Sequence, residues 1–140
     1  MKKTKALICV SLALILMSLC ACFSNDKLSY YKDKTNYITV TGRVESIKYS
    51  EDSSALYISF SSLNPQLDDI SFKIVGANLQ IVEQNKIDEK LKIGEQISFM
   101  TAPKYFGDGY VMPIVAITIN GESLLEFEKG YQNWLNWLVE

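Results

Sequence analysis

This chain of 140 residues has the length of a single domain, and its 16 acidic and 14 basic residues give a net charge of −2. It contains no histidine, which excludes Ser-His-Asp and Cys-His catalysis, histidine-based metal sites and a histidine pH switch. The three cysteines, Cys9, Cys20 and Cys22, all lie near the N-terminus, so the remainder of the chain has no disulfide or thiol. We therefore expect a domain held together by packing alone, without a metal, a cofactor or catalytic residues.

The N-terminal segment has the pattern of a secretory signal. Three lysines precede an apolar run over residues 6–19, and the order Leu19-Cys20-Ala21-Cys22 follows. This ending resembles the lipobox of bacterial lipoproteins, which implies a signal peptide over residues 1–21, a fatty acid such as palmitate on Cys22, and anchoring to the extracytoplasmic face of the cell membrane. Cys20 is the rival acceptor, but Leu19 would then precede the cut, where the lipobox has a small residue.

Two alternatives stay open for this segment. One is a plain signal peptide cut near Ala21, and the other is an uncleaved anchor helix. The apolar run is shorter than the roughly 20 residues of a comfortable spanning helix. The first alternative would release the domain on the far side of the membrane, and the second would keep it attached to the membrane.

After removal of the signal, the chain would be acidic and would begin with a polar segment. Cleavage removes three of the basic residues and none of the acidic ones, which changes the net charge from −2 to −5. Because such a surface repels phosphate backbones, nucleic acid is not an expected partner, and the only expected membrane contact is the lipid. Residues 22–36 are polar without a clear period and indicate a flexible tether that leads to a domain over residues 37–140.

The tethered domain shows the periodicities of strands and two helices. Alternation over Ile38–Tyr49, with a change of parity after Val44, predicts a long bulged strand. Shorter strands are expected over residues 56–60, 70–74, 97–101 and 110–119, the last one ended by Asn120-Gly121. Helical spacing is expected over residues 78–90, with Asn78 as N-cap, and over residues 124–139, where Gly130 is unfavourable.

The order of three strands, a helix and two strands resembles the OB-fold, a five-stranded Greek-key barrel. The long bulged first strand with Gly42, the helix over residues 78–90 and the loop over residues 103–109 carry this resemblance. We therefore expect a mainly β domain, with a helix between strands three and four and a C-terminal helix. A small β-sandwich is the alternative fold. The same features are similar to those of small OB-fold-like bacterial lipoproteins of uncharacterised family.

The loop that joins the last two expected strands is the strongest candidate for ligand binding. Aromatic rings and a carboxylate flank two glycines at a position where OB-folds commonly contact ligands. The candidate residues of this loop are Tyr105, Phe106, Asp108 and Tyr110. The alternative is a plain hairpin whose glycines supply the turn and whose aromatic rings cover the end of the sheet.

Two strand residues complete the candidate binding face. Arg43, the single arginine of the chain, has the planar fork that binds a carboxylate or phosphate, or it pairs with an acid on a neighbouring strand. Tyr57 is expected on the sheet face opposite Leu56 and Ile58. We expect these residues to form one face with the loop.

These observations favour a non-catalytic binding or interaction module anchored to the membrane, with a protein, peptide or glycan as ligand. A first rival is a glycan hydrolase that uses carboxylates alone, drawn from Glu45, Glu95, Asp108 and Glu122. A second rival is a structural subunit of an envelope complex.

Overall fold

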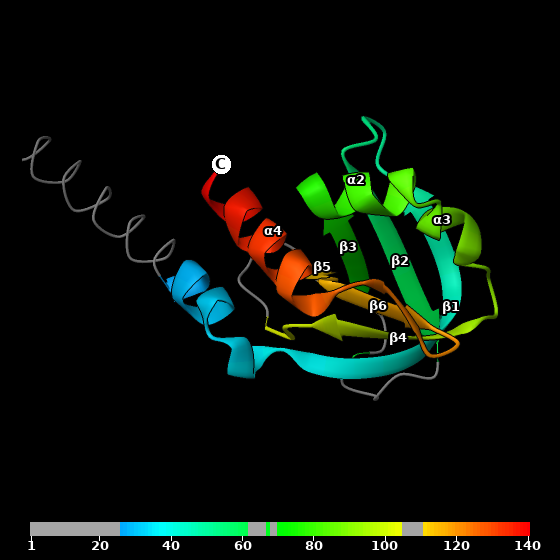
Figure 1. Ribbon diagram of the computed structural model, residues 1–140, viewed down its shortest axis with the longest axis horizontal. Helices are drawn as coiled ribbons and strands as arrows, with labels where there is room; N and C mark the ends of the chain where they lie inside the picture. Colours follow the sequence, from blue (N-terminus) through cyan, green and yellow to red (C-terminus); the bar gives the residue numbers. More distant parts are fainter. Residues whose placement is uncertain (1–25, 62–66, 68–69, 105–110) are drawn as a thin grey trace, which may run out of the picture. The chain divides into compact units, whose positions relative to one another are not determined.

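The computed structural model describes residues 26–61, 67, 70–104 and 111–140 (Figure 1). The chain divides into two units, residues 1–33 and residues 34–140. In the first unit, residues 26–32 are helical, whereas their polarity predicts a coil. Cys22 and the rest of the signal segment lie outside the described residues. Among the helices that are described, none has the length and hydropathy needed to cross a bilayer.

The second unit combines seven strands with short helices. In chain order the elements are η1 (Lys34–Asn36), β1 (Ile38–Tyr49), β2 (Ala55–Ser61), β3 (Ser71–Val75), α2 (Gly76–Gln84), α3 (Ile87–Lys90), β4 (Gln96–Thr101), β5 (Val111–Pro113), β6 (Ala116–Ile119), β7 (Glu122–Leu125) and α4 (Phe127–Val139). The strands form one mixed sheet in the order β5-β3-β2-β1-β4-β6-β7. The expectation of a mainly β domain is thus confirmed.

β1 connects the two halves of this sheet. Its first half pairs with β4 and its second half with β2, both antiparallel, and Figure 1 shows the strand curving between them. The register shifts between Val44 and Ser46, where the sequence predicts a bulge. A bulge of this kind bends the strand and increases its twist, which lets one strand serve both halves.

The structure differs from the expected five-stranded barrel. The sheet is open and has seven strands, and it is neither a closed barrel nor a two-sheet sandwich in the described part of the chain. The expected fifth strand is divided at Ile114 and Val115 into β5 and β6. Asn120 and Gly121, with φ of 52° and 80°, do not end the sheet but form the two-residue turn of a hairpin with β7.

The helical segments also differ from their expected bounds. The expected helix over residues 78–90 is broken between α2 and α3, because Lys86 adopts a left-handed conformation with φ of 53°. α2 begins earlier than expected, at Gly76 after Val75, so Asn78 is not an N-cap but a buried residue of the helix. α4 begins at Phe127 after its N-cap Glu126, and the preceding residues 122–125 belong to β7.

The hydrophobic core lies between one face of the sheet and the α2–α3 segment. Its centre is aromatic: the rings of Phe60 and Phe99 stack at 4.4 Å, and Phe72 contacts both edge-on. Leu79 and Val82 of α2 and Ile87 of α3 close the core from the other side. The side chains on the opposite face of β1, β2 and β3 are mostly polar, and this face carries the candidate site.

Candidate functional site

The outer face of β1, β2 and β3 carries two transverse rows of polar side chains. The register places Lys48, Tyr57 and Lys73 opposite one another in the first row. The second row is Ser46, Ser59 and Ser71, two residues further along each strand. All six alternate with core residues, because successive side chains of a strand point to opposite faces. We call these six residues the outer-face grid.

A hollow of about 360 Å³ lies over part of the outer-face grid. Its lining residues are Ser46, Lys48, Tyr49, Ser50, Glu51, Tyr57, Ile58, Ser59 and Ser71. The hydroxyls of Ser46 and Ser59 form a hydrogen bond of 2.6 Å. Six of the nine lining residues carry a hydroxyl group, two of them tyrosines, and Lys48 and Glu51 are the two charged ones.

Neighbouring structure holds one end of the first row and one tyrosine of the hollow. The Lys73 ammonium lies 4.8 Å from the ring centre of Trp137 and 5.7 Å from that of Trp134, so α4 holds it. Near the hollow, the Tyr49 hydroxyl donates a hydrogen bond of 2.8 Å to Asp88. Burial, followed by this bond and the carboxylate charge, raises the pKa of Tyr49 to about 12. Tyr49 is therefore a neutral donor at physiological pH.

Arg43 and Tyr57 share the outer face but are not brought together. Arg43 lies opposite Ser61, four residues from Tyr57 along β2, which corresponds to about 13 Å. The Arg43 guanidinium donates a hydrogen bond of 2.7 Å to the carbonyl oxygen of Gly94. It thereby holds the loop between α3 and β4. The other expected members of the face, Tyr105, Phe106, Asp108 and Tyr110, lie outside the described residues.

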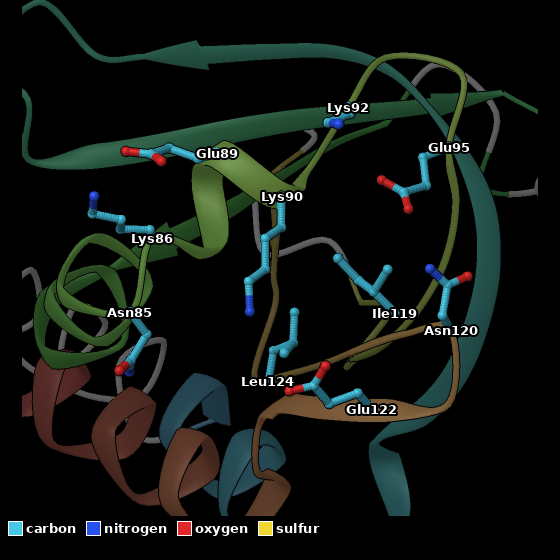
Figure 2. Close-up of a pocket in the computed structure, with 10 residues that line it drawn as sticks. All are labelled: Asn85, Lys86, Glu89, Lys90, Lys92, Glu95, Ile119, Asn120, Glu122 and Leu124. Carbon is cyan, nitrogen blue, oxygen red and sulfur yellow. The ribbon is translucent and has the colours of Figure 1, made fainter.

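A second and larger concave region lies between the α2–α3 segment and the β6–β7 hairpin (Figure 2). Its volume is about 650 Å³. We call it the charged groove, and it is lined by Asn85, Lys86, Glu89, Lys90, Lys92, Glu95, Ile119, Asn120, Glu122 and Leu124. Sequence reasoning missed the three lysines as site residues, although they cluster visibly between positions 86 and 92.

The charged groove contains two of the four acids named for a carboxylate hydrolase. Glu95 and Glu122 both line it, whereas Glu45 is exposed on β1 and is not part of its lining. Asp108 lies outside the described residues. One carboxylate oxygen of Glu95, Oε2, is buried without a hydrogen-bond partner. Within the described residues, no cluster of three or more acids, cysteines or histidines could hold a metal ion.

Comparisons of this chain with protein-family models, with curated proteins and with solved structures find no match.

Proposed function

We propose that this chain is a lipid-anchored protein of the extracytoplasmic membrane face whose outer-face grid binds a glycan without chemical change. The single observation that carries the binding role is the hollow beside Tyr57, in which six of the nine lining residues carry a hydroxyl group. The anchor is supported by the basic head, the apolar run and the Leu-Cys-Ala-Cys ending.

The chemistry of the hollow favours a sugar over the other expected ligands. A sugar ring presents hydroxyls that donate and accept hydrogen bonds, and the hydroxyls of Ser59 and Ser71 do the same. The Tyr57 side chain is half-buried in the sheet face, and its ring offers an apolar surface for the C–H side of a sugar. A charged peptide would find only one lysine and one glutamate, Lys48 and Glu51, at this hollow.

We also propose that the fold is related to the OB-fold. Every strand of a closed barrel pairs with two neighbours. The segment of β5 and β6 pairs parallel with β3 at its start and antiparallel with β4 at its end. Between these pairings, the Ile114 N–H bonds to the Lys73 carbonyl and the Val115 N–H bonds to the Met100 carbonyl. These contacts to both halves of the sheet support a related topology.

The binding proposal is tested by measuring glycan capture on an array of envelope-type oligosaccharides. We expect Tyr57→Ala to weaken capture at least about tenfold through loss of the stacking surface, and Ser59→Ala to weaken it less. Thr41→Ala is the matched control, because Thr41 lies on the same face and hydrogen-bonds Ser98 away from the hollow. Absence of glycan capture, or capture that Tyr57→Ala leaves unchanged, would overturn the proposal.

The anchor is tested by metabolic labelling with an alkyne fatty acid in bacterial cells. Cys22→Ala should abolish the label and leave an unprocessed or released chain, because the acceptor thiol is lost. Cys20→Ala is the matched control and should keep the label. Labelling that is lost in Cys20→Ala and kept in Cys22→Ala would show that Cys20 carries the lipid and would overturn the assignment to Cys22.

A carboxylate-dependent glycan hydrolase is the second candidate function, favoured by the presence of Glu95 and Glu122 in one groove. Glycosidases need two carboxyl groups about 5–10 Å apart on either side of the bond that breaks. Incubation with the captured glycan and analysis of the products tests it. Cleavage that Glu95→Gln and Glu122→Gln both abolish would establish this function in place of simple binding.

A further inference from the structure

We infer that the charged groove is a second binding site, for a short peptide with free ammonium and carboxylate termini. The groove is separate from the outer-face grid, with which it shares no lining residue. Its volume of about 650 Å³ lies within the range of small-ligand sites. The inference is independent of the proposed glycan site.

Opposite charges reach the groove from opposite walls. Lys90 comes from α3, whereas Glu122 comes from the β6–β7 hairpin. Lys86 and Glu89 also line the groove, but in Figure 2 their side chains extend away from Lys90 and Glu122. In Figure 2, the Lys90 side chain extends from α3 toward Leu124 and Glu122. No ion pair within 4 Å joins these side chains in the described part of the chain. A ligand that carries both charges can satisfy both walls at once.

Glu95 adds a reason for an ammonium group. Its Oε2 oxygen is buried and accepts no hydrogen bond, although its side chain lines the groove. A buried carboxylate oxygen without a donor is unfavourable, because it has lost water and gained nothing in return. A ligand ammonium, with three N–H donors, would supply this bond once a rotation of the Glu95 carboxylate turns Oε2 toward the groove. In Figure 2, the Glu95 carboxylate points toward the space between Lys90 and Lys92.

The loop that carries Glu95 is held in place before any ligand arrives. The Gly94 N–H bonds to the Val44 carbonyl at 2.7 Å, and the Val44 N–H bonds to the Glu95 carbonyl at 2.8 Å. Arg43 adds its hydrogen bond to the Gly94 carbonyl. A groove wall fixed in this way reduces the ordering cost of binding.

The remaining lining fits the middle of a peptide. Ile119 and Leu124 provide an apolar floor for a small side chain. The amides of Asn85 and Asn120 offer donors and acceptors that complement peptide N–H and C=O groups. An inorganic anion would use the lysines alone and would leave Glu95 and Glu122 without a partner.

The test uses trialanine and its two capped forms as probes, measured by calorimetry on the full chain in detergent. We expect trialanine to bind, and N-acetylation or C-amidation each to weaken binding at least about tenfold, because each removes one charge-assisted contact. Glu95→Gln should weaken trialanine but leave the acetylated form unaffected. Lys90→Gln should weaken the binding of trialanine but leave the binding of the amidated form unaffected. The reason is that N-acetylation and Glu95→Gln remove the same contact, and C-amidation and Lys90→Gln remove the same contact.

Lys129→Gln and Glu45→Gln are the matched controls, because both residues are exposed and neither lines the groove. They should leave trialanine binding unchanged. Failure of trialanine to bind, equal affinity for the capped forms, or equal loss in the controls would overturn the inference. Tyr57→Ala should keep trialanine affinity, so failure of the glycan proposal would be seen separately.

Discussion

The side-chain amide of Asn78 donates a hydrogen bond of 2.8 Å to the carbonyl oxygen of Gly130, which joins α2 to α4. The Asn78 side-chain oxygen accepts a second hydrogen bond of 2.9 Å from the side-chain amide of Asn133, so both the nitrogen and the oxygen of this buried amide are hydrogen-bonded. Helix α4 covers Lys73 with its tryptophans, and Lys73 belongs to the outer-face grid. The joint between the two helices therefore supports one edge of the proposed glycan site.

Replacement of Asn78 by alanine should lower the free energy of unfolding by about 1–3 kcal/mol, because buried partners lose their hydrogen bonds. Asn133→Ala removes only the second bond and should cost less. Urea unfolding followed by tryptophan fluorescence measures both changes. Equal stability of Asn78→Ala and the unaltered chain would show that the joint does not stabilise the fold.

Gly130 should not tolerate alanine, although alanine normally stabilises a helix interior by about 1 kcal/mol relative to glycine. A Cβ atom at position 130 would lie 1.8 Å from the carbonyl oxygen of Val115, so the helix would have to move away from the sheet. We expect Gly130→Ala to destabilise the chain by about 1–3 kcal/mol.

The control for Gly130 is Gln132→Ala, an exposed position on the same helix that should change stability by less than about 0.5 kcal/mol. Thermal unfolding followed by circular dichroism measures both variants. A Gly130→Ala variant that is more stable than the unaltered chain would contradict the close approach of α4 to the sheet.

Gly130 and Asn78 also mark the limit of sequence reasoning. Alternation and a change of parity predicted β1 and its bulge, because these signals lie within one strand. Gly130 looked only unfavourable, and Asn78 looked like a cap, because the atoms that explain them belong to Val115 and to α4. Contacts between residues so far apart in sequence leave no local pattern.

The candidate sites also combine features with a local sequence signal and features that depend on residues distant in the sequence. The outward position of Tyr57 followed from strand alternation, and the structure places it as expected. Three segments that are far apart in the sequence form the charged groove. Glu95 and Glu122 were named as candidate acids, but their position beside the lysines depends on this convergence and could not be predicted. Arg43 was expected either to bind a ligand or to pair with an acid on a neighbouring strand, and the structure shows its guanidinium bonded to the Gly94 carbonyl.

Asp52 should titrate at unusually low pH. Hydroxyl bonds from Ser50 and Ser54, both 2.7 Å, and the Ser54 N–H lower its pKa from 3.8 to about 2. Because the folded pKa is depressed, this contribution to stability is complete above about pH 4 and is lost as the pH falls toward 2. Carboxyl carbon NMR shifts recorded against pH measure the titration directly.

A matched pair of serine variants tests the cause of this low pKa. Ser54→Ala should raise the pKa of Asp52, since it removes one of the hydroxyl donors. Ser61→Ala, at the far end of β2, should leave it unchanged. An Asp52 that titrates near 3.8 in the unaltered chain would contradict the turn geometry.

Tyr49 should lose its proton only in strong alkali, and this delay should appear in the stability of the fold. Burial is the largest cause that raises its pKa from 10 to about 12, and the hydrogen bond to Asp88 is the next. Since the folded pKa exceeds the unfolded one, the contribution to stability is complete below pH 10 and declines as the pH rises toward 12. Tyr49→Phe should show a smaller loss of stability over this interval, measured by urea unfolding at each pH.

The chain has eight tyrosines, so the titration of Tyr49 is obtained from the difference in absorbance at about 295 nm between the unaltered chain and Tyr49→Phe. Asp88→Asn separates the two causes, because it removes the carboxylate while the burial of Tyr49 remains. We expect this variant to lower the pKa of Tyr49 but to leave it above 10. A pKa of about 12 that persists in Asp88→Asn would assign the whole effect to burial and would exclude the hydrogen bond between β1 and α3 as a cause.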